Sequence, residues 1–475
     1  MPDKNAFDPV IREIAEYVIS PRIFSKETID TARYCFMDSL GCALLALNYP
    51  QCTKLLGPTV PGATLHKGAR VFGTNFELDP VQAAFNIGTM VRWLDYNDTW
   101  LAAEWGHPSD NLGAIWGVAD YMSRREKNYK MNDILYAMVK AHEVQGVLAL
   151  ENSFNRVGLD HVLLVRIAST ALSCKLLGLN IEQTCNAISQ AWADGGALRT
   201  YRHAPNTGSR KSWAAGDAGA RAVFHALQTM KGEMGYSTVL SANDWGFEDV
   251  ILKGNKITLP QKLHSYVMDN VLFKISYPAE FHAQTAVEAA LQLHSQAAKK
   301  FDLIEKIELF TQESGFRIIN KSGPLNNPAA RDHCLQYMVA VALIYGDLTA
   351  DHYENDIAAN PQIEHLRQLM VCHEDPAYSK SYLNPEKRSI ANAVQIHYSD
   401  GSSSNKIEIH YPVGHRRRRH EGMPLLQSKF EQNIATRFDD EKCQRIIDLF
   451  QDTQRFDNYT VSDFSDLLSS KDDLK

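Results

Sequence analysis

The sequence predicts an α+β fold in which a large all-helical domain is joined to a smaller α/β domain. Over the first 270 or so residues, apolar side chains recur at helical spacing. After Lys274, short segments alternate apolar and polar residues as strands do. Beyond Met423 the helical pattern returns, which predicts C-terminal helices that pack back on the first domain. We therefore expect a helical domain over residues 1–270 that residues 413–475 complete, and a smaller α+β domain over residues 271–412.

Local signals predict the individual helices of the first domain. Apolar residues recur every three or four positions over residues 11–19, and Ser25 is a good N-cap for the helix that follows it. Longer helices are expected over residues 134–150 and 162–177. The second of these should end at Gly178, because glycine readily adopts the conformation that closes a helix.

The second domain carries the strand signals. Residues 306–311 alternate with a period of two, as a half-buried strand does. Residues 392–398 and 406–411 flank the turn sequence Ser-Asp-Gly at 399–401, which predicts a β-hairpin. A helix is expected between these strands, over residues 331–345.

Composition limits the class of protein. The chain has 475 residues, and at roughly 100–200 residues per domain it should form two to four domains. Its net charge of −7 argues against a general nucleic-acid-binding protein, and no apolar run approaches the roughly 18 residues of a membrane span. Acidic residues such as Asp8 and Glu13 argue against a transit peptide. We expect a cytoplasmic protein, or a mitochondrial matrix protein whose presequence has been removed.

The eight cysteines are scattered along the chain, without a Cys-x-x-Cys pair. This spacing is typical of buried thiols in a reducing compartment rather than of a disulfide framework. It also provides no local set of ligands for zinc or for an iron–sulfur cluster. We therefore expect no metal and no cofactor.

The densest group of chemically useful residues lies at 92–110. Asp95 and Thr99 are four residues apart and would share one face of a helix, and His107-Pro108 marks a loop or a new helix start. A carboxylate, a hydroxyl and an imidazole gathered this closely could move a proton and orient a hydroxyl group. The alternative is an amphipathic helix end with a capping aspartate.

A basic segment at residues 199–213 leads into an alanine-rich helix. Arg202, Arg210 and Lys211 lie in this segment, and the backbone amides at the helix start would add to their positive potential. It is not a Walker loop, because Gly-x-x-x-x-Gly-Lys is absent. The segment is either an anion-binding loop or a solvated basic loop.

A third motif runs from Lys274 to His282. Lys274 stands among apolar residues, a setting that favours a neutral amine and could suit a lysine to catalysis, although a lone lysine usually lies at the surface. Pro278 fits the first turn of a helix that runs through Val287, and His282 would lie about one turn in.

Other candidates have simple structural alternatives. His161 is a lone histidine, whose usual role is a hydrogen-bonded structural one, and Cys334 and Tyr337 fit core positions on a helix. The four consecutive arginines from Arg416 to Arg419 could form a targeting or nucleic-acid patch, a solvated run, or a binding site for a polycarboxylate. Because they are contiguous, the four cannot all face one ligand.

Four of these motifs, taken in chain order, resemble the MmgE/PrpD family. They are the 95–107 segment, the Lys211 loop, the Lys274-x-x-Tyr277-Pro278 motif and the helix that carries Tyr337. The resemblance extends over nearly the whole chain, and residues 92–112 and 198–217 are similar to the branch of the family that dehydrates 2-methylcitrate. It implies a helical domain and a smaller α/β domain with the active site between them, a homodimer, and no cofactor.

The resemblance also implies the residues of an active site. Its catalytic residues would be Asp95, His107, His161, Lys211 and Lys274, and its substrate-binding residues would be Thr99, Tyr337 and His282, with Arg202 and Arg210 added from the basic segment. Two departures matter. Ala214 stands where many members have a histidine, and Val162-Leu163 stand where the family has Pro-Thr. No group at residue 214 can therefore do acid–base work.

The implied reaction removes water from 2-methylcitrate, as in propionate breakdown by the methylcitrate cycle, with positioned acid and base groups and some turnover of citrate or cis-aconitate. Three alternatives remain open at this point. They are decarboxylation of cis-aconitate, isomerisation or epimerisation of a related polycarboxylate, and non-enzymatic binding of a polyanion by the arginine run.

Overall fold

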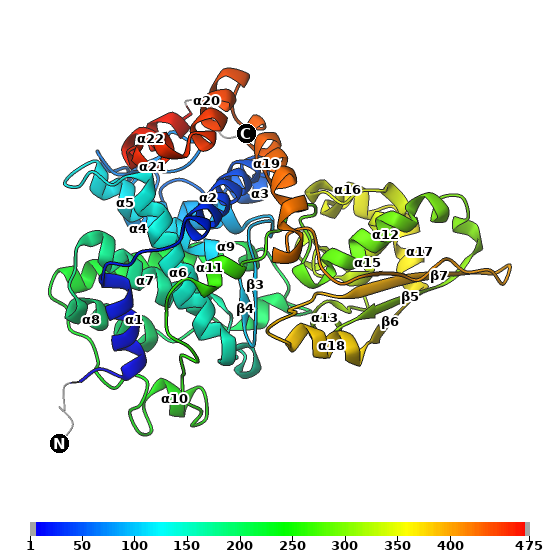
Figure 1. Cartoon of the computed structure of the whole chain (residues 1–475), viewed down its shortest axis with the longest axis horizontal. Coiled ribbons are helices and arrows are strands. Elements are labelled where there is room, and N and C mark those ends of the chain that lie inside the picture. The colour runs from blue at the N-terminus through cyan, green and yellow to red at the C-terminus, as the bar shows by residue number, and fades with distance from the viewer. Residues whose placement is uncertain (1–5, 471–475) are drawn as a thin grey trace. The chain divides into compact units, whose positions relative to one another are not determined.

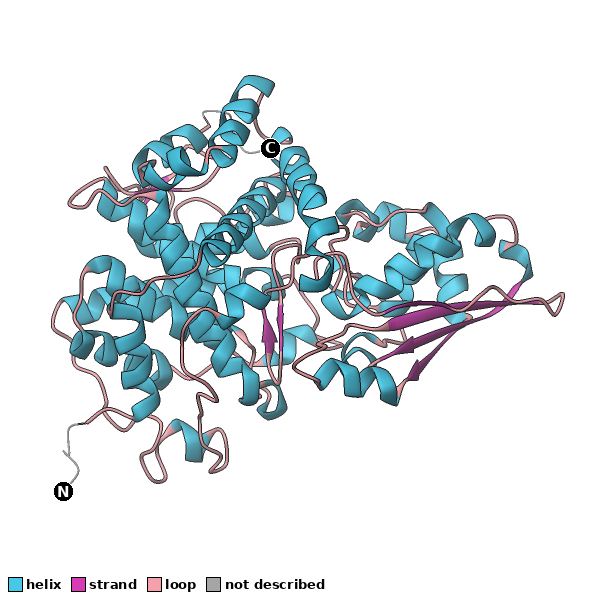
Figure 2. Cartoon of the chain, viewed as in Figure 1, coloured by secondary structure: helices cyan, strands magenta, loops and turns pink. Residues whose placement is uncertain are grey.

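The computed structural model describes residues 6–470, and the chain divides into two compact units. The first comprises Met1–Ala204, Arg210–Val271 and Leu426–Lys475, and the second comprises Pro205–Ser209 and Leu272–Leu425. The fold is α+β and mostly helical, which confirms the predicted fold class (Figure 1, Figure 2). Within residues 6–470, no helix combines the length and the apolar character that crossing a membrane requires.

The helices of the first unit begin and end at local signals. Ser25 Oγ accepts a hydrogen bond from the Thr28 amide at 3.1 Å and caps α2, as predicted. Gly178 has φ +86° and ends α7, as predicted. The helices are α1 (Pro9–Ile19), α2 (Lys26–Ala46), α3 (Pro50–Thr53), α4 (Pro80–Arg92), α5 (Leu112–Ser123), α6 (Met131–Glu151), α7 (Val162–Leu177), α8 (Ile181–Ala193), α9 (Arg210–Met230), α10 (Phe247–Val250), α11 (Tyr266–Asn270), α20 (Asp440–Gln451), α21 (Thr453–Asn458) and α22 (Val461–Leu468).

Short elements connect these helices. The two hairpins of the first unit are β1 (Ala69–Arg70) with β2 (Glu77–Leu78), and β3 (Trp100–Leu101) with β4 (Trp105–Gly106). The 3₁₀ turns are η1 (Pro108–Asn111), η2 (Asn155–Val157) and η3 (Arg199–Arg202). Helix α19 (Arg419–Ala435) starts in the second unit's stretch of chain and continues into the first.

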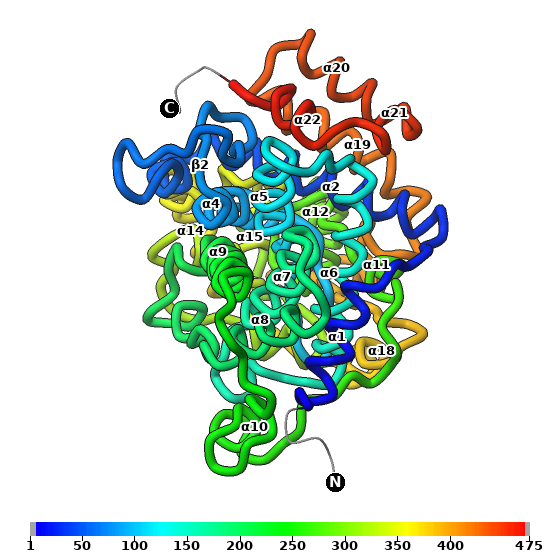
Figure 3. Tube along the Cα trace, turned by 90° about the vertical axis from the view of Figure 1, so that its left-hand side faces the viewer, coloured from blue at the N-terminus to red at the C-terminus, as the bar shows by residue number. Residues whose placement is uncertain are grey.

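The packing of α4 against α9 determines which helix ends meet in the first unit. A Cβ on Gly88 would lie 2.8 Å from the Cα of Gly216, so the two helices approach each other at their backbones. A Cβ on Gly219 would lie 3.9 Å from the carbonyl oxygen of Ala84, so the helices run antiparallel. The C-terminal end of α4 therefore lies beside the N-terminal end of α9; Figure 3 shows these helices with their neighbours α5 and α7.

The N-terminal end of α7 lies at the same place. Val162 is the first residue of α7 and shares an apolar cluster with Ala214, in the second turn of α9. His161 directly precedes α7, and Lys211 is the second residue of α9. The ends of three helices therefore meet in one region, and two of them are N-terminal ends, which favour anions.

A four-stranded sheet with strand order β6-β5-β7-β8 forms the second unit together with its covering helices. Its strands are β5 (Ile304–Thr311), β6 (Met370–Glu374), β7 (Asn392–Tyr398) and β8 (Ile407–Ile409). The antiparallel pair β7–β8 confirms the predicted hairpin, and Gly401 has φ +80° in its turn. Strand β6 pairs in parallel with β5, and the sequence did not predict it.

The helices of the second unit share an apolar core with the sheet. The helix predicted over residues 331–345 is interrupted: Asn327 caps a first turn, residues 332–334 leave the helix, and a second helix follows. The helices are α12 (Gln284–Ala297), α13 (Glu313–Ile319), α14 (Pro328–Arg331), α15 (Leu335–Tyr345), α16 (Asn355–Ala358), α17 (Pro361–Gln368) and α18 (Pro376–Leu383), with 3₁₀ turns η4 (Phe281–Ala283), η5 (Phe301–Leu303), η6 (Ala350–Tyr353) and η7 (Arg416–Arg418).

Candidate active site

The loop after α4 carries the first two candidates, but not in the predicted conformation. Helix α4 ends at Arg92, and Asp95 has φ +50°, in the left-handed region. A residue in that conformation ends a helix, and aspartate tolerates it better than most residues. Asp95 and Thr99 therefore do not share a helix face, and the expectation that they do was wrong. Both side chains are nevertheless buried.

His107 is held by the same loop. Its Nδ1 lies 2.6 Å from the backbone oxygen of Asp98 and 3.4 Å from Thr99 Oγ1. Because a carbonyl oxygen can only accept, Nδ1 carries a hydrogen and donates it. In the neutral ring the lone pair is then on Nε2, which lies 3.6 Å from Asp95 Oδ1. His107 directly precedes η1, in agreement with the loop or helix start predicted at His107-Pro108.

Asp95 is balanced by Arg92, whose Nη1 lies 2.8 Å from Asp95 Oδ1. Both side chains are only 3% exposed. The carboxylate therefore lies between a permanent cation and the lone-pair nitrogen of His107. When His107 takes up a proton, Asp95 faces the resulting imidazolium and stabilises it.

His161 lies next to His107, with a distance of 5.8 Å between ring centroids. Among the described residues, neither ring nitrogen of His161 has a hydrogen-bond partner, although Nδ1 lies 3.4 Å from Asp160 Oδ1. Burial, helped by the charges of Arg202 and Arg199, outweighs Asp160 and holds the pKa of His161 well below its usual value. His161 is therefore a neutral imidazole with an unused lone pair, and it directly precedes the first residue of α7.

Arg202 is paired with Asp160. Its Nε and Nη2 both donate to the carboxylate, the second at 3.1 Å, and Arg199 Nη1 lies 4.0 Å away. Burial alone would raise the pKa of Asp160, but Arg202, His161 and Arg199 outweigh burial and hold that pKa well below its usual value. Arg199 also lies over the ring of Trp105, at 5.2 Å from its centroid.

Lys211 and Arg210 begin α9, as the sequence predicts. Lys211 is buried, with 3% of its surface exposed, whereas the Arg210 side chain is 37% exposed. Arg210 donates to Asp217 at 2.9 Å and lies over the Trp213 ring, at 4.2 Å from its centroid. It lines a cavity of about 170 Å³ together with Arg166 and Arg221.

The second unit holds the three remaining candidates. The structure corrects the position of Pro278, which precedes the helix instead of beginning it, because Glu280 caps the short turn η4 that contains His282. His282 Nδ1 lies 2.8 Å from Glu280 Oε1, and its Nε2 lies 3.2 Å from the hydroxyl of Tyr382. Both nitrogens of His282 are therefore already engaged inside this unit.

Lys274 and Tyr337 are buried in the second unit. Burial would raise the pKa of Glu280, but the charges of His282, His333 and Lys274 outweigh it and lower that pKa to about 2. The Tyr337 hydroxyl donates to the backbone oxygen of His352 at 2.7 Å, and burial raises the pKa of Tyr337 to about 12. The tyrosine keeps its proton and can still accept a hydrogen bond.

Three of the four arginines from Arg416 to Arg419 contact different partners. Arg417 donates to the backbone oxygen of Glu386, and Arg418 pairs with Glu288 at 2.9 Å. Arg419 lies over the ring of Phe273. Arg417, Arg418 and Arg419 therefore do not converge on one partner, as expected of consecutive residues.

Sequence reasoning missed the residues that support His107. Asp98 Oδ2 lies 2.7 Å from His142 Nε2, and Asp98 Oδ1 accepts hydrogen bonds from Ser109. His142 lies in α6, where the sequence predicted only a long helix over residues 134–150. The available signal was the pair His142-Glu143, two adjacent ionisable residues among mostly apolar ones.

The chain is similar to known proteins over nearly its whole length. The MmgE/PrpD N-terminal domain matches residues 12–260, and the MmgE/PrpD C-terminal domain matches residues 277–454. The 2-methylcitrate dehydratase of Salmonella typhimurium is 55% identical over 97% of both chains, and that of Cupriavidus necator is 55% identical over the same shares. A relative from Yarrowia lipolytica, named 2-methylcitrate dehydratase, mitochondrial, is 52% identical over 98% of this chain and 91% of its own length.

Proposed function

The chain belongs to the MmgE/PrpD family, and from this premise we propose that it is an enzyme that removes water from 2-methylcitrate to give 2-methyl-cis-aconitate. Relatives that carry the name 2-methylcitrate dehydratase match it over nearly their whole length, in bacteria and in a yeast. The structural observation that carries the proposal is the buried contact of His107 Nε2 with Asp95, where three helix ends meet.

The reaction has two chemical difficulties that such a site can address. The hydrogen that must leave lies on a carbon next to a carboxylate, so its acidity is low. Hydroxide is a poor leaving group and needs a proton. An enzyme therefore needs a base, an acid and positive charge beside the carboxylate that takes up the developing negative charge.

We assign the proton transfers to the histidine pair. Nδ1 of His107 already donates to the protein, so Nε2 is the nitrogen that exchanges a proton with the substrate. Asp95 orients this ring and stabilises its protonated form. His161 is a neutral imidazole within the same region and is the second group that can exchange a proton.

We assign the electrostatic work to the two buried lysines, Lys211 and Lys274. Lys211 stands in the first turn of α9, where the helix dipole adds to its charge. Both would stabilise the enediolate-like carboxylate of the transition state. The proposed substrate-binding groups are Thr99, Arg202, Arg210, Tyr337 and His282. To bind substrate, His282 would exchange its contact with Tyr382 for one with a substrate oxygen.

We propose that no metal or cofactor takes part. An iron–sulfur dehydratase would hold its cluster through several cysteine thiolates. Among the described residues, no group of side chains that could hold a metal ion contains more than one cysteine, and the group that contains one is Cys35 with Asp98 and His142. The last two are already hydrogen-bonded to each other.

We further propose that the protein forms a homodimer and acts in the cytoplasm, or in the mitochondrial matrix of a eukaryote. The family resemblance supports the homodimer, and a relative named 2-methylcitrate dehydratase, mitochondrial, supports the matrix as the alternative compartment. Static light scattering on the purified protein tests the first.

The decisive experiment compares substrates. We expect a higher kcat/KM for 2-methylcitrate than for citrate, followed by alkene absorbance with the products identified by mass. A pocket for one methyl group provides roughly 10–200-fold discrimination, so some turnover of citrate is expected. A ratio that favours citrate would reject this substrate. Carbon dioxide release from cis-aconitate as the main reaction would point to a decarboxylase instead.

A further inference from the structure

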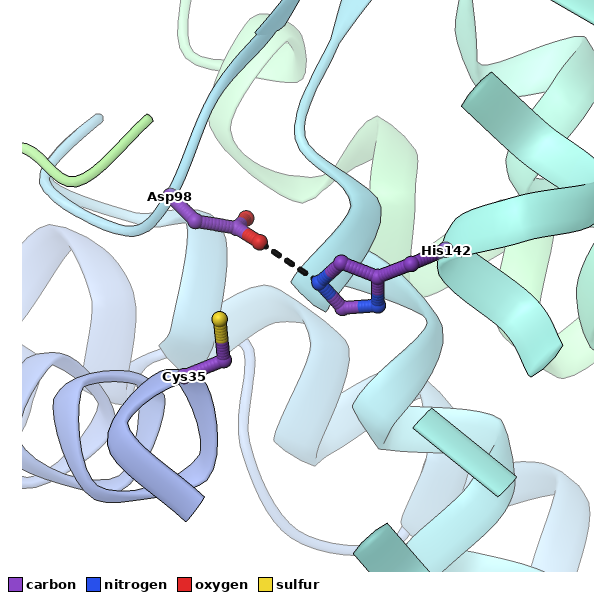
Figure 4. Close-up of side chains that lie close together, drawn as sticks. All are labelled: Cys35, Asp98 and His142. Carbon is purple, nitrogen blue, oxygen red and sulfur yellow. Dashed lines mark hydrogen bonds and ion pairs between the residues drawn. The ribbon is translucent and has the colours of Figure 1, made fainter. Parts of the chain in front are cut away.

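A buried acid–histidine pair lies directly behind His107. Asp98 Oδ2 and His142 Nε2 are 2.7 Å apart, and both residues are at most 1% exposed. Figure 4 shows the carboxylate facing the imidazole edge-on, with Cys35 beside them. Neither Asp98 nor His142 belongs to the proton-transfer group assigned above.

Asp98 connects this pair to the proposed base in two ways. Its backbone oxygen accepts the hydrogen of His107 Nδ1 at 2.6 Å. Its other carboxylate oxygen, Oδ1, accepts from the amide of Ser109 at 3.0 Å and from its hydroxyl at 2.6 Å. Ser109 is two residues after His107, so Asp98 holds both the ring and the backbone that carries the ring.

The ring of His142 is held in place by its own helix. Its Nδ1 lies 2.8 Å from the backbone oxygen of Met138, one turn earlier in α6. Both ring nitrogens therefore face acceptors, an arrangement that an imidazolium paired with the Asp98 carboxylate satisfies. The long helix α6 thereby fixes the orientation of Asp98.

We propose that His142 is a positioning residue for the dehydration: through Asp98, it fixes the tautomer and orientation of His107 so that Nε2 faces the substrate. The inference rests on the proposed function. A hydrogen bond from Nδ1 to the Asp98 carbonyl also makes Nε2 a stronger base, because it stabilises the protonated ring. Loss of the His142 contact would loosen Asp98 and weaken both effects.

Other charged and polar groups around His107 also affect the basicity of its Nε2. Arg92 and Asp95 face its Nε2 side, and His161 lies beside the ring. Around the Asp98–His142 pair, burial raises the pKa of Asp110 and of Glu143 to about 7. The closest basic partner of the Asp98 carboxylate in this pair is His142 Nε2, at 2.7 Å.

A metal ion is a poorer explanation of the same residues. Cys35, Asp98 and His142 have potential ligand atoms within 4.8 Å of one another. However, both carboxylate oxygens of Asp98 already accept hydrogen bonds, and the closest contact joins the two potential ligands directly. Cys35 Sγ lies 3.8 Å from Met268 Sδ, which already gives the thiol a contact.

Two substitutions at residue 142 separate the two hydrogen bonds of the ring. The amide nitrogen of glutamine can take the place of Nε2, so His142→Gln keeps a donor to Asp98. The amide of asparagine can take the place of Nδ1, so His142→Asn keeps only the bond to Met138. Cys35→Ala is the matched control, since it removes the third side chain and leaves the Asp98–His142 bond.

We expect His142→Asn to lower kcat about 10–100-fold, the scale of substitutions behind a functional group, with KM little changed. The acidic limb of its pH–rate profile should shift to lower pH, because Nε2 of His107 becomes less basic. His142→Gln should recover most of the loss, and Cys35→Ala should behave as the parent. Equal losses in the Asn and Gln variants, or an unshifted profile in the Asn variant, would overturn the proposal.

Two further measurements keep the test decisive. If His142→Asn does not fold, Ser109→Ala removes the hydroxyl contact to Asp98 and should shift the profile in the same direction by a smaller amount. ¹⁵N-labelled histidine reports the Nδ1–H tautomer of His107 without any turnover, with the signal assigned by its loss in His107→Gln. A parent inactive on 2-methylcitrate would reject the proposed function. An unchanged His107 tautomer in the Asn variant, or in Ser109→Ala if that variant is used, would reject the role of His142.

Discussion

Asp160 is the charge on which the region around His161 depends. It is completely buried and accepts two hydrogen bonds from Arg202, with Arg199 4.0 Å away. Two arginines that are always charged therefore share one carboxylate. Replacing Asp160 by asparagine keeps the size of the side chain but leaves the guanidinium of Arg202 buried without a counter-charge.

Removing one partner of a buried ion pair costs about 3–5 kcal/mol, because the remaining charge is uncompensated. We expect a loss of this size in the free energy of unfolding of Asp160→Asn at pH 7. The pKa of Asp160 is depressed in the folded state, so the unfolded chain binds more protons as the pH falls below about 3.9. The difference in free energy of unfolding between the parent and Asp160→Asn is thus complete above that pH and shrinks as the pH falls toward the folded-state pKa.

Urea titration followed by tryptophan fluorescence, at pH 7 and at successively lower pH, measures this difference. The matched control is Glu182→Gln, which breaks the exposed pair with Arg12 and should cost about 1 kcal/mol or less. A double variant, Asp160→Asn with Arg202→Met, should recover part of the stability because the guanidinium closest to the lost carboxylate is removed with it; Arg199, 4.0 Å from Asp160, remains and limits the recovery. If Asp160→Asn is no less stable than Glu182→Gln, the reasoning from burial and pairing is wrong.

Three other outcomes are expected. His107→Ala and Lys211→Ala should each lower turnover about 10²-fold or more with an unchanged circular dichroism spectrum, and near-normal turnover would remove that residue from the mechanism. Burial raises the pKa of Asp110 to about 7, so between about pH 4 and 7 the folded state binds a proton that the unfolded state does not. The free energy of unfolding should therefore decline as the pH rises through that window. Urea midpoints at pH 5 and 8 should differ less in Asp110→Asn than in the parent. Turnover should survive treatment with a chelator, and a loss that added metal restores would contradict the cofactor-free mechanism.

The elements that could be predicted from the sequence are those whose signals are local. A serine that bonds to the amide three residues on starts α2, and a glycine with positive φ ends α7. The turn of the β7–β8 hairpin likewise needs a positive φ at Gly401. In each case one residue type has a conformational or hydrogen-bonding property that its neighbours lack, so its position in the sequence is informative.

The elements that were missed depend on contacts distant in sequence. Strand β6 reads Met-Val-Cys-His-Glu, which does not alternate clearly, and it becomes a strand by pairing in parallel with β5. The interruption of the helix over residues 331–345 has a similar origin. The backbone oxygen of Asp332 accepts a hydrogen bond from the Glu280 amide, so this residue is tied to the segment around η4 rather than to a continuous helix.

The candidate site shows the same division at the level of single residues. Motifs and resemblance singled out His107, His161 and Lys211 as candidates. They did not predict the pairing of Asp98 with His142, because an apolar helical pattern gives no reason to expect a partner 44 residues away. Burial supplies that reason. An ionisable side chain in a helix that is otherwise core must find a partner or lose its charge, since burying it unpaired is costly. His142-Glu143 inside the predicted helix over residues 134–150 therefore implies two partners from other segments: Asp98 for the histidine, and the backbone amides of His264 and Val267 for the glutamate.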